Sequence, residues 1–158
     1  MKQRLKNVVA PILAVAALAA AATAVAQQAP KPEQLIKWRQ SAYQVIAWNT
    51  GRVKANVDGQ YNKEEVIKAA NTIAAIANSG LGALYAPGTE TGKGWHDTAV
   101  KPELFTDKKA GEVAANFNKE ANELAKVAAL GDVAAVKTQL GKLQGTCKAC
   151  HDDFRKKD

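Results

Sequence analysis

The sequence predicts an all-α protein, built as an antiparallel up-down-up-down four-helix bundle. Apolar side chains recur at spacings of three and four residues along four separate segments, which is the period of helices with one buried face. Turn-forming residues separate these segments: Asp58-Gly59, Pro87-Gly88 and Gly131-Asp132. Four such helices joined by mostly short connections favour a bundle in which successive helices are antiparallel.

The first 26 residues have the pattern of a cleavable signal peptide. Residues 8–22 are uncharged and rich in alanine, they follow three basic residues, and Ala24-Val25-Ala26 has small residues where a signal peptidase cleaves. An uncleaved membrane anchor is the alternative, but Pro11 and the cleavage site disfavour it. We therefore expect residues 1–26 to be removed, which leaves the domain 27–158 in the periplasm without a membrane anchor.

The mature chain has a small positive charge. Loss of the three basic residues of the signal lowers the formal charge from +7 to +4, and the remaining charges are spread along the chain. A charge of this size and distribution argues against binding of nucleic acid.

The first helix is expected between Lys31-Pro32-Glu33 and Asp58-Gly59. Proline and an acidic residue suit the first turn of a helix, and Asp58-Gly59 ends the apolar pattern. The apolar residues form two neighbouring seams: Leu35, Trp38, Ala42 and Val45 in the first, and Ile36, Tyr43, Ile46 and Val53 in the second. This apolar face is wide enough to contact more than one partner.

The second helix is expected from Asn62 or Lys63 to Pro87-Gly88. Its first turn contains two glutamates, which suit the positive end of the helix dipole. The apolar stripe is Val66, Ala69, Ile73, Ile76, Gly80 and Leu84. Residues 87–102 contain three glycines and no clear period, so they are expected to form the one long loop.

The third helix is expected to begin at Pro102 or Asp107 and to end at Leu130. Its buried stripe is Val113, Phe117, Ala121, Leu124 and Ala128. Asp132 is then the expected N-cap of a fourth helix, which has the most regular pattern in the chain. Its apolar positions alternate three and four residues apart: Val133, Val136, Leu140, Leu143, Cys147, Cys150 and Phe154.

The fourth helix contains a C-x-x-C-H motif, Cys147-Lys148-Ala149-Cys150-His151, which is the signature of covalent haem attachment. On a helix the two thiols lie on one face and reach two vinyl groups along one haem edge, while His151 points the same way to ligate the iron. A zinc site needs a second ligand pair, but the only other histidine is His96. A redox C-x-x-C follows a strand, and a disulfide here would close almost no loop. The motif therefore predicts one covalently attached haem c.

The place of this motif on the last helix, near the C-terminus, is similar to that in cytochrome c′, the class II c-type cytochromes. Other segments that resemble this family are Lys31-Pro32-Glu33, Arg39-Gln40-Ser41-Ala42, Pro87-Gly88-Thr89-Glu90, Lys101-Pro102-Glu103 and Phe154-Arg155-Lys156-Lys157. The resemblance spans the whole mature chain and implies a homodimer. The second apolar seam of the first helix is the expected dimer interface.

The resemblance also implies roles for residues outside the motif. Tyr43 would cover the distal face of the haem without ligating the iron, Arg39 and Gln40 would lie near the haem propionates, and Arg155 would lie near the proximal histidine. The sequence leaves open whether Tyr43 blocks access, hydrogen-bonds a ligand, ligates the iron or packs in the core. A solvent-facing Arg39, and an Arg155 that only compensates the end of the helix dipole, are the plainer alternatives.

The sixth coordination position of the iron decides what a haem protein does. The only methionine is Met1, which leaves with the signal, and His96 lies in the glycine-rich loop, where an exposed histidine is the simpler interpretation. We therefore expect five-coordinate, mostly high-spin iron that binds NO and CO and can exchange electrons with a periplasmic redox partner. A dedicated electron carrier with a filled sixth position is the alternative. An enzyme is not expected, because the stretch around Tyr43 has no acid–base side chain.

Overall fold

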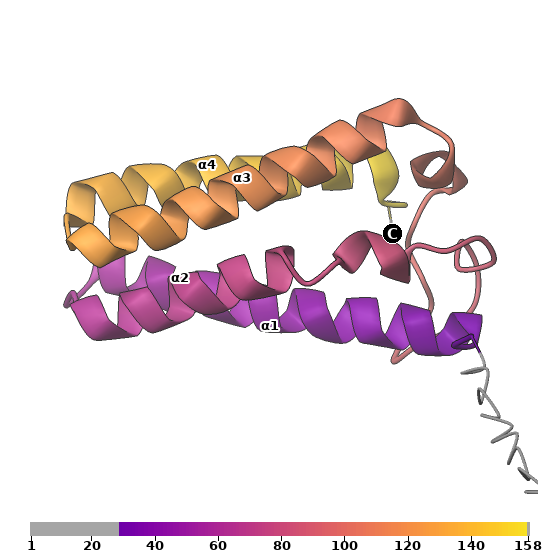
Figure 1. The fold of residues 1–158 in the computed structure, drawn as a ribbon, viewed down its shortest axis with the longest axis horizontal. Helices are drawn as coiled ribbons and strands as arrows, with labels where there is room; N and C mark the ends of the chain where they lie inside the picture. Colours follow the sequence, from indigo (N-terminus) through magenta and orange to yellow (C-terminus); the bar gives the residue numbers. More distant parts are fainter. Residues whose placement is uncertain (1–28, 158) are drawn as a thin grey trace, which may run out of the picture.

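The computed structural model describes residues 29–157, so the expected signal peptide lies outside the described part of the chain. Four helices form the bundle: α1 (Pro32–Asp58), α2 (Lys63–Ala77), α3 (Lys108–Leu130) and α4 (Val133–Phe154). Figure 1 shows α1 and α2 in one layer and α3 and α4 in the other, with the long loop and the C-terminus at the end where α1 begins. The predicted all-α, up-down-up-down architecture is confirmed. Within residues 29–157, no helix combines the length and the apolar character needed to cross a membrane.

Three helices begin where a side chain satisfies the free backbone N–H groups of the first turn. Asn62, Asp107 and Asp132 cap α2, α3 and α4 and accept hydrogen bonds of 2.8 to 3.2 Å from these groups. Asp132 is therefore the N-cap that the sequence predicts. Pro102, the other predicted start of the third helix, begins instead a short 3₁₀ helix, η2 (Pro102–Phe105).

The second helix is shorter than its apolar pattern predicts. The expectation that it continues to Pro87-Gly88 is wrong, because α2 ends at Ala77 and a separate 3₁₀ helix, η1 (Leu81–Leu84), follows. Gly80 has a φ of +87°, a left-handed conformation that interrupts a right-handed helix. The apolar pattern runs on across this break because Leu84 still packs against the core.

The hydrophobic core is one cluster to which all four helices contribute. Its buried residues are Ile46, Val53, Val57, Val66, Ala69, Ala70, Ile73, Ala77, Leu81, Ala121, Leu124, Ala128, Val136, Leu140 and Leu143. Phe117 of the predicted α3 stripe packs against the cluster only in part, and Val133, the first position of the α4 stripe, exposes 38% of its surface. The other predicted positions that belong to the cluster are Ala121, Leu124, Ala128, Val136, Leu140 and Leu143. Val113 and Phe154 are buried outside it, and Cys147 and Cys150 are partly buried.

The two apolar seams of α1 have different surroundings from those expected. Ile36, Ile46 and Val53 of the second seam are buried inside the protomer, so the prediction that this seam forms a dimer interface is wrong. Trp38 and Val45 of the first seam expose 49% and 39% of their surfaces. Periodicity alone does not distinguish the two seams, because both are apolar and lie side by side on one helix.

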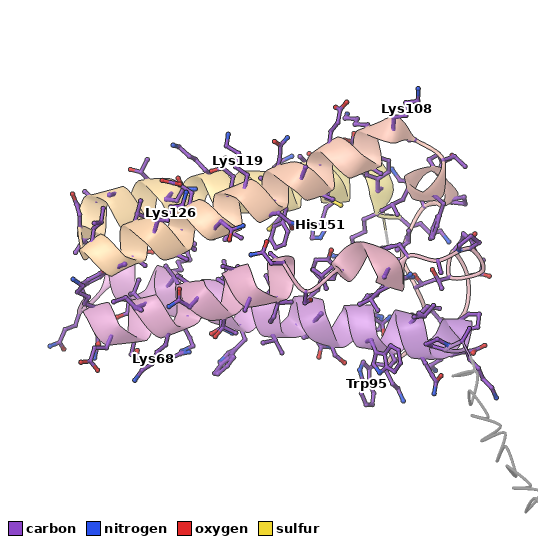
Figure 2. The ribbon with its side chains drawn as sticks, viewed as in Figure 1. Lys68, Trp95, Lys108, Lys119, Lys126 and His151 are labelled. Carbon is purple, nitrogen blue, oxygen red and sulfur yellow. The ribbon has the colours of Figure 1, made fainter. Side chains whose placement is uncertain are left out.

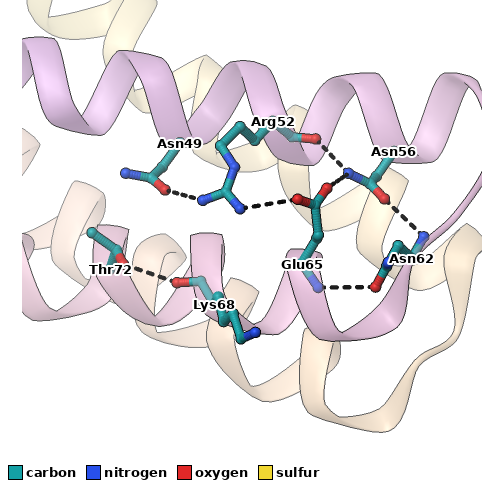
Figure 3. A network of polar contacts seen from close by, with 7 residues as sticks. All are labelled: Asn49, Arg52, Asn56, Asn62, Glu65, Lys68 and Thr72. Carbon is teal, nitrogen blue, oxygen red and sulfur yellow. Dashed lines mark hydrogen bonds and ion pairs between the residues drawn. The ribbon is translucent and has the colours of Figure 1, made fainter.

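A polar network joins α1 to the beginning of α2 (Figure 3). Arg52 donates to Asn49 Oδ1 over 3.1 Å and pairs with Glu65 over 3.4 Å. Asn56 donates to the other carboxylate oxygen of Glu65 over 3.3 Å and accepts from the backbone N–H of Asn62 over 2.8 Å. Asn49 and Asn56 are buried, and buried polar side chains need such partners. The network therefore sets the register of α1 against α2.

Candidate haem-binding site

The C-x-x-C-H motif lies on the last two turns of α4. Cys147 and Cys150 are free, partly buried thiols three residues apart on one side of the helix, and His151 is exposed. Phe154 anchors the end of the helix, since its side chain is buried and its carbonyl accepts the backbone N–H of Lys101 over 2.8 Å. In Figure 2, His151 lies between the α3–α4 pair and the α1–α2 pair. The three side chains therefore have the helical arrangement that the motif predicts.

Burial shifts the pKa values of all three motif side chains toward their uncharged forms. Burial raises the pKa of the Cys147 thiol, and burial together with Cys147 raises the pKa of Cys150. Burial lowers the pKa of His151, and the nearby cation of Arg155 lowers it further. A neutral imidazole has a free nitrogen lone pair, which is the form that ligates iron.

Tyr43 of α1 faces the motif from across the bundle. The start of α1 lies beside the end of α4, because the two helices are antiparallel neighbours. Burial raises the pKa of Tyr43, interaction with Tyr85 lowers it, and the thiols of Cys150 and Cys147 raise it. The phenol is therefore within electrostatic range of both cysteines, although its ring exposes 40% of its surface. This position is consistent with a distal residue and excludes a place in the main hydrophobic core.

Tyr85 is a site residue that the sequence did not indicate. It follows η1, and its ring centre lies 4.8 Å from the guanidinium carbon of Arg39 and 6.4 Å from the ring centre of Phe105. Like Tyr43, it is coupled electrostatically to Cys150. The sequence did not single out Tyr85 because the second helix was expected to continue to Pro87-Gly88. On such a helix Tyr85 would be an ordinary helical residue.

Arg39 is buried and holds both ends of the long loop. Its two terminal nitrogens donate to Leu84 O over 3.3 Å, to Thr89 Oγ1 and O over 2.8 and 2.7 Å, and to Thr98 Oγ1 over 2.6 Å. The side chain exposes only 3% of its surface, so the alternative of a solvent-facing arginine is wrong. Within residues 29–157 no carboxylate forms an ion pair with it. These four hydrogen bonds leave Nε–H as the remaining donor of the guanidinium.

A buried cation without an anionic partner fits a group that carries carboxylates. Buried charges in proteins are normally paired, because desolvation of an unpaired charge is costly. Haem carries two propionates, and Arg39 lies one helical turn before Tyr43 on α1. The thiols, the imidazole and this unpaired guanidinium together fit a covalently bound haem.

Gln40 and His96 join the long loop to the outside of α1. Gln40 accepts from Trp95 N over 2.7 Å and donates to His96 O over 2.9 Å, and its amide nitrogen lies 3.2 Å from His96 Nδ1. A side chain at Gly94 would meet Gln40 Oε1 at 2.5 Å, so the loop backbone touches α1 directly. His96 is therefore an exposed loop residue tied to Gln40, and not a group directed at the motif.

Arg155 lies just beyond the end of α4, beside the long loop. Its backbone forms an isolated bridge with Val100, and the next residue donates its N–H to Ala99 O over 2.7 Å. The side chain is exposed, and its charge lowers the pKa of His151. Arg155 is thus near the proposed proximal histidine, as the resemblance implies.

Comparison with protein families identifies the family, the fold and the cofactor. The family model described as cytochrome c′ matches residues 34–155. The chain belongs to the cytochrome c′ family. It is 75% identical over 130 residues to the cytochrome c′ of Rhodocyclus tenuis, covering 81% of this chain and 98% of that one. As in the rest of this family, the haem is of the c type and covalently attached, and two cysteines are present near the C-terminus.

Solved structures of cytochromes c′ have the same fold. One, described as having an unusual ligand-controlled dimer dissociation, is 49% identical, with a TM-score of 0.78 over 81% of this chain and 98% of its own. A nitric oxide complex of a variant of the cytochrome c′ from Alcaligenes xylosoxidans is 30% identical, with a TM-score of 0.71 over 80% of this chain and 98% of its own. A carbon monoxide-bound variant of the same protein has the same identity, TM-score and coverage.

Proposed function

We propose that this cytochrome c′ is a periplasmic protein whose haem iron has an open sixth position and binds the small neutral gases NO and CO. Cys147 and Cys150 form the thioether bonds to the haem, and His151 is its axial ligand. The haem supplies an iron atom that binds gases and changes between the ferric and ferrous states. The helical spacing of the three side chains and the NO and CO complexes of variants of one relative support this proposal.

The proposal of an open sixth site rests on the position of Tyr43 opposite the two thiols. The residue that α1 presents there is a phenol, which is a weaker iron ligand than the methionine or histidine of six-coordinate electron carriers. His96 is held on the loop by Gln40, and Met1 belongs to the proposed signal. These placements support the proposal of five-coordinate, mostly high-spin iron.

The surrounding residues orient the haem and limit what reaches it. Arg39 offers Nε–H and its unpaired charge to a propionate, while its other donors hold the loop in place. Gln40 acts beside it by holding the loop against α1. Burial, and after it the charge of Arg155, lower the pKa of His151 and so favour its neutral imidazole. A distal face covered by Tyr43 admits small uncharged ligands, and it offers no strong acid–base group for an enzymatic role.

We further propose that the protein is a homodimer that pairs through the outer face of α1. Trp38, Val45 and Trp48 expose 49%, 39% and 64% of their surfaces, although all three are large and apolar. Clusters of exposed large apolar side chains mark interaction sites. A relative of the same fold is described as a dimer that dissociates under ligand control, which supports a second copy of this chain as the partner.

The absorption spectrum of the dithionite-reduced periplasmic protein tests the open sixth site. A broad, unsplit visible band with a high-spin Soret band is expected, because a strong sixth ligand is absent from the proposed distal face. Sharp and separate α and β bands would contradict the proposal and point to a dedicated electron carrier. Periplasmic fractionation of the producing cells tests the location, and cell-bound protein with an intact N-terminus would contradict it.

A further inference from the structure

The tip of the long loop, residues 92–98, packs against the outside of α1. The tip is closed by the backbone N–H of Thr98, which donates to Gly92 O over 2.9 Å. A Cβ added at Gly94 would lie 2.8 and 2.9 Å from the backbone N and Cα of Lys37, so the backbone of the tip touches that of α1. Glycine is the residue that permits so close an approach.

Trp95, at this tip, is held by three contacts and is nevertheless exposed. Its backbone N–H donates to Gln40 Oε1 over 2.7 Å, its indole N–H donates to Ser41 Oγ over 2.8 Å, and Lys37 Nζ lies 4.2 Å from its ring centre. It exposes 58% of its surface, and in Figure 2 it projects from α1 on the side away from the α3–α4 pair. A ring that is already fixed loses little conformational entropy when a partner binds.

Trp95 continues the exposed apolar face of α1. Lys37, Ser41 and Trp48 are separated by four and seven residues, so they lie on one side of the helix. The Trp95 side chain contacts the first two of these residues, which places it in line with Trp48. Val45 lies between them, one turn after Ser41. Trp95, Val45 and Trp48 therefore form one exposed apolar row that comes from two segments of the chain.

This row lies on an uncharged stretch of α1. Between Lys37 and Arg52 the only charged residue of the helix is Arg39, which is buried. The centres of protein interfaces are poor in charged residues and rich in aromatic ones. In a two-fold dimer the same patch of each copy meets the other, and an uncharged patch can do so without like-charge repulsion. The row therefore suits a second copy of the chain.

We propose that Trp95 is a dimer contact, whose ring the loop tip holds on α1 so that it packs against a second copy of the chain together with Val45 and Trp48. This inference rests on the proposed homodimer. It adds to the interface a residue of the long loop, and it makes the interface depend on the close approach of Gly94 to α1.

Sedimentation equilibrium of the haem-loaded protein measures the dimer dissociation constant of each variant. Trp95→Ala is expected to raise it at least about tenfold, as for a tryptophan removed from the centre of an interface. Gly94→Ala keeps every exposed aromatic residue but forces the tip away from α1, and is expected to raise it at least about threefold. Gly111→Ala is the matched control and is expected to match wild type, because a Cβ added there meets nothing within 4 Å.

Hydroxyl-radical labelling read by mass spectrometry gives a second measure that needs no variant. As the concentration of the wild-type protein is raised through the dissociation constant, the oxidation of Trp95 and Trp48 is expected to fall. Oxidation of Leu130, which is exposed at the far end of α3, is expected to stay unchanged.

Two results would overturn the inference while leaving the homodimer in place. One is a Trp95 that stays reactive in the dimer, and the other is a Trp95→Ala protein that dimerises like wild type. A Gly94→Ala protein with the wild-type dissociation constant would overturn the dependence on the loop tip. A wild-type protein that is monomeric at every concentration would instead contradict the proposed homodimer, and the inference with it.

Discussion

Tyr43 combines an exposed ring with a position opposite two thiols, and this combination makes it the expected gate of the distal site. Tyr43→Ala removes the ring and is expected to speed carbon monoxide association by about tenfold, which corresponds to a barrier lowered by about 1.4 kcal/mol. Flash photolysis of the reduced protein measures this rate. An unchanged rate would show that another residue limits access.

Cys147 and Cys150 are expected to be the only covalent links to the haem. Replacement of both by serine leaves His151 in place but removes the sulfur atoms that form thioethers. The variant is expected to release its haem completely on acid–acetone extraction, whereas the wild-type protein keeps it. Haem that stays with the double variant would contradict the assignment of these two cysteines.

Arg39 is the residue whose loss should most disturb the long loop. Arg39→Met removes four hydrogen bonds from a buried position and is expected to lower the free energy of unfolding by about 2–4 kcal/mol. Urea unfolding of the haem-loaded protein measures this change. Lys54→Met on the same helix is the control, with an expected loss within about 1 kcal/mol, because its ion pair with Asp58 is exposed. Equal losses in the two variants would contradict the role of Arg39.

At the scale of elements, α1 has one face in the core and another that bears exposed aromatic residues. Trp48→Asp places a charge on the outer face, where it would be desolvated in a dimer, and is expected to weaken dimerisation at least about tenfold. Sedimentation equilibrium measures the dimer dissociation constant. Leu130→Asp is the control, because Leu130 exposes 76% of its surface at the far end of α3. A Trp48→Asp protein that dimerises like the control would contradict the proposed interface.

The ends of the elements show which sequence signals were reliable. Asp132 was identifiable as an N-cap because the capping hydrogen bonds are made within the first turn. The end of α2 was not, because Leu84 keeps the helical apolar spacing although it lies beyond Gly80, on η1. A repeating apolar pattern indicates which residues face the core. It does not mark the end of a helix, because the pattern continues wherever the chain still packs on that core.

At the scale of the whole molecule, acidic side chains at the end of the bundle away from the motif link stability to pH. Hydrogen bonds from Lys54 and Lys137 lower the pKa of Asp58 to about 2, and Asn56 and Arg52 lower the pKa of Glu65. Because both pKa values are lower in the folded state than in the unfolded chain, their stabilisation is complete above the unfolded pKa of about 4. It is lost as the pH falls toward 2.

The expected result is a urea unfolding midpoint that decreases between pH 5 and about pH 2, and decreases less in Asp58→Asn. Asp97→Asn is the control, because no lysine or arginine side chain pairs with Asp97 in the described part of the chain. The same acid dependence in Asp58→Asn and wild type would contradict this link between α1 and α4.

The sequence by itself determined the four-helix architecture, the motif on the last helix and the choice of haem c. Each follows from local rules: the 3.6-residue period, capping side chains, and the fixed spacing of two thiols and an imidazole along one helix. Tyr43, Arg39, Gln40 and Arg155 came from resemblance to the family, because no local pattern relates them to residues a hundred positions away.

Only the tertiary structure decided which seam of α1 is buried, that Arg39 holds the loop, and that Tyr85 lies against the guanidinium of Arg39. Each of these depends on the rotation of one helix against its neighbours or on the path of the loop. The rotation of a helix and the path of the loop are set by the sum of contacts between segments distant in the chain, such as the contact of Arg39 with Thr98. Such contacts leave no repeating pattern in the sequence.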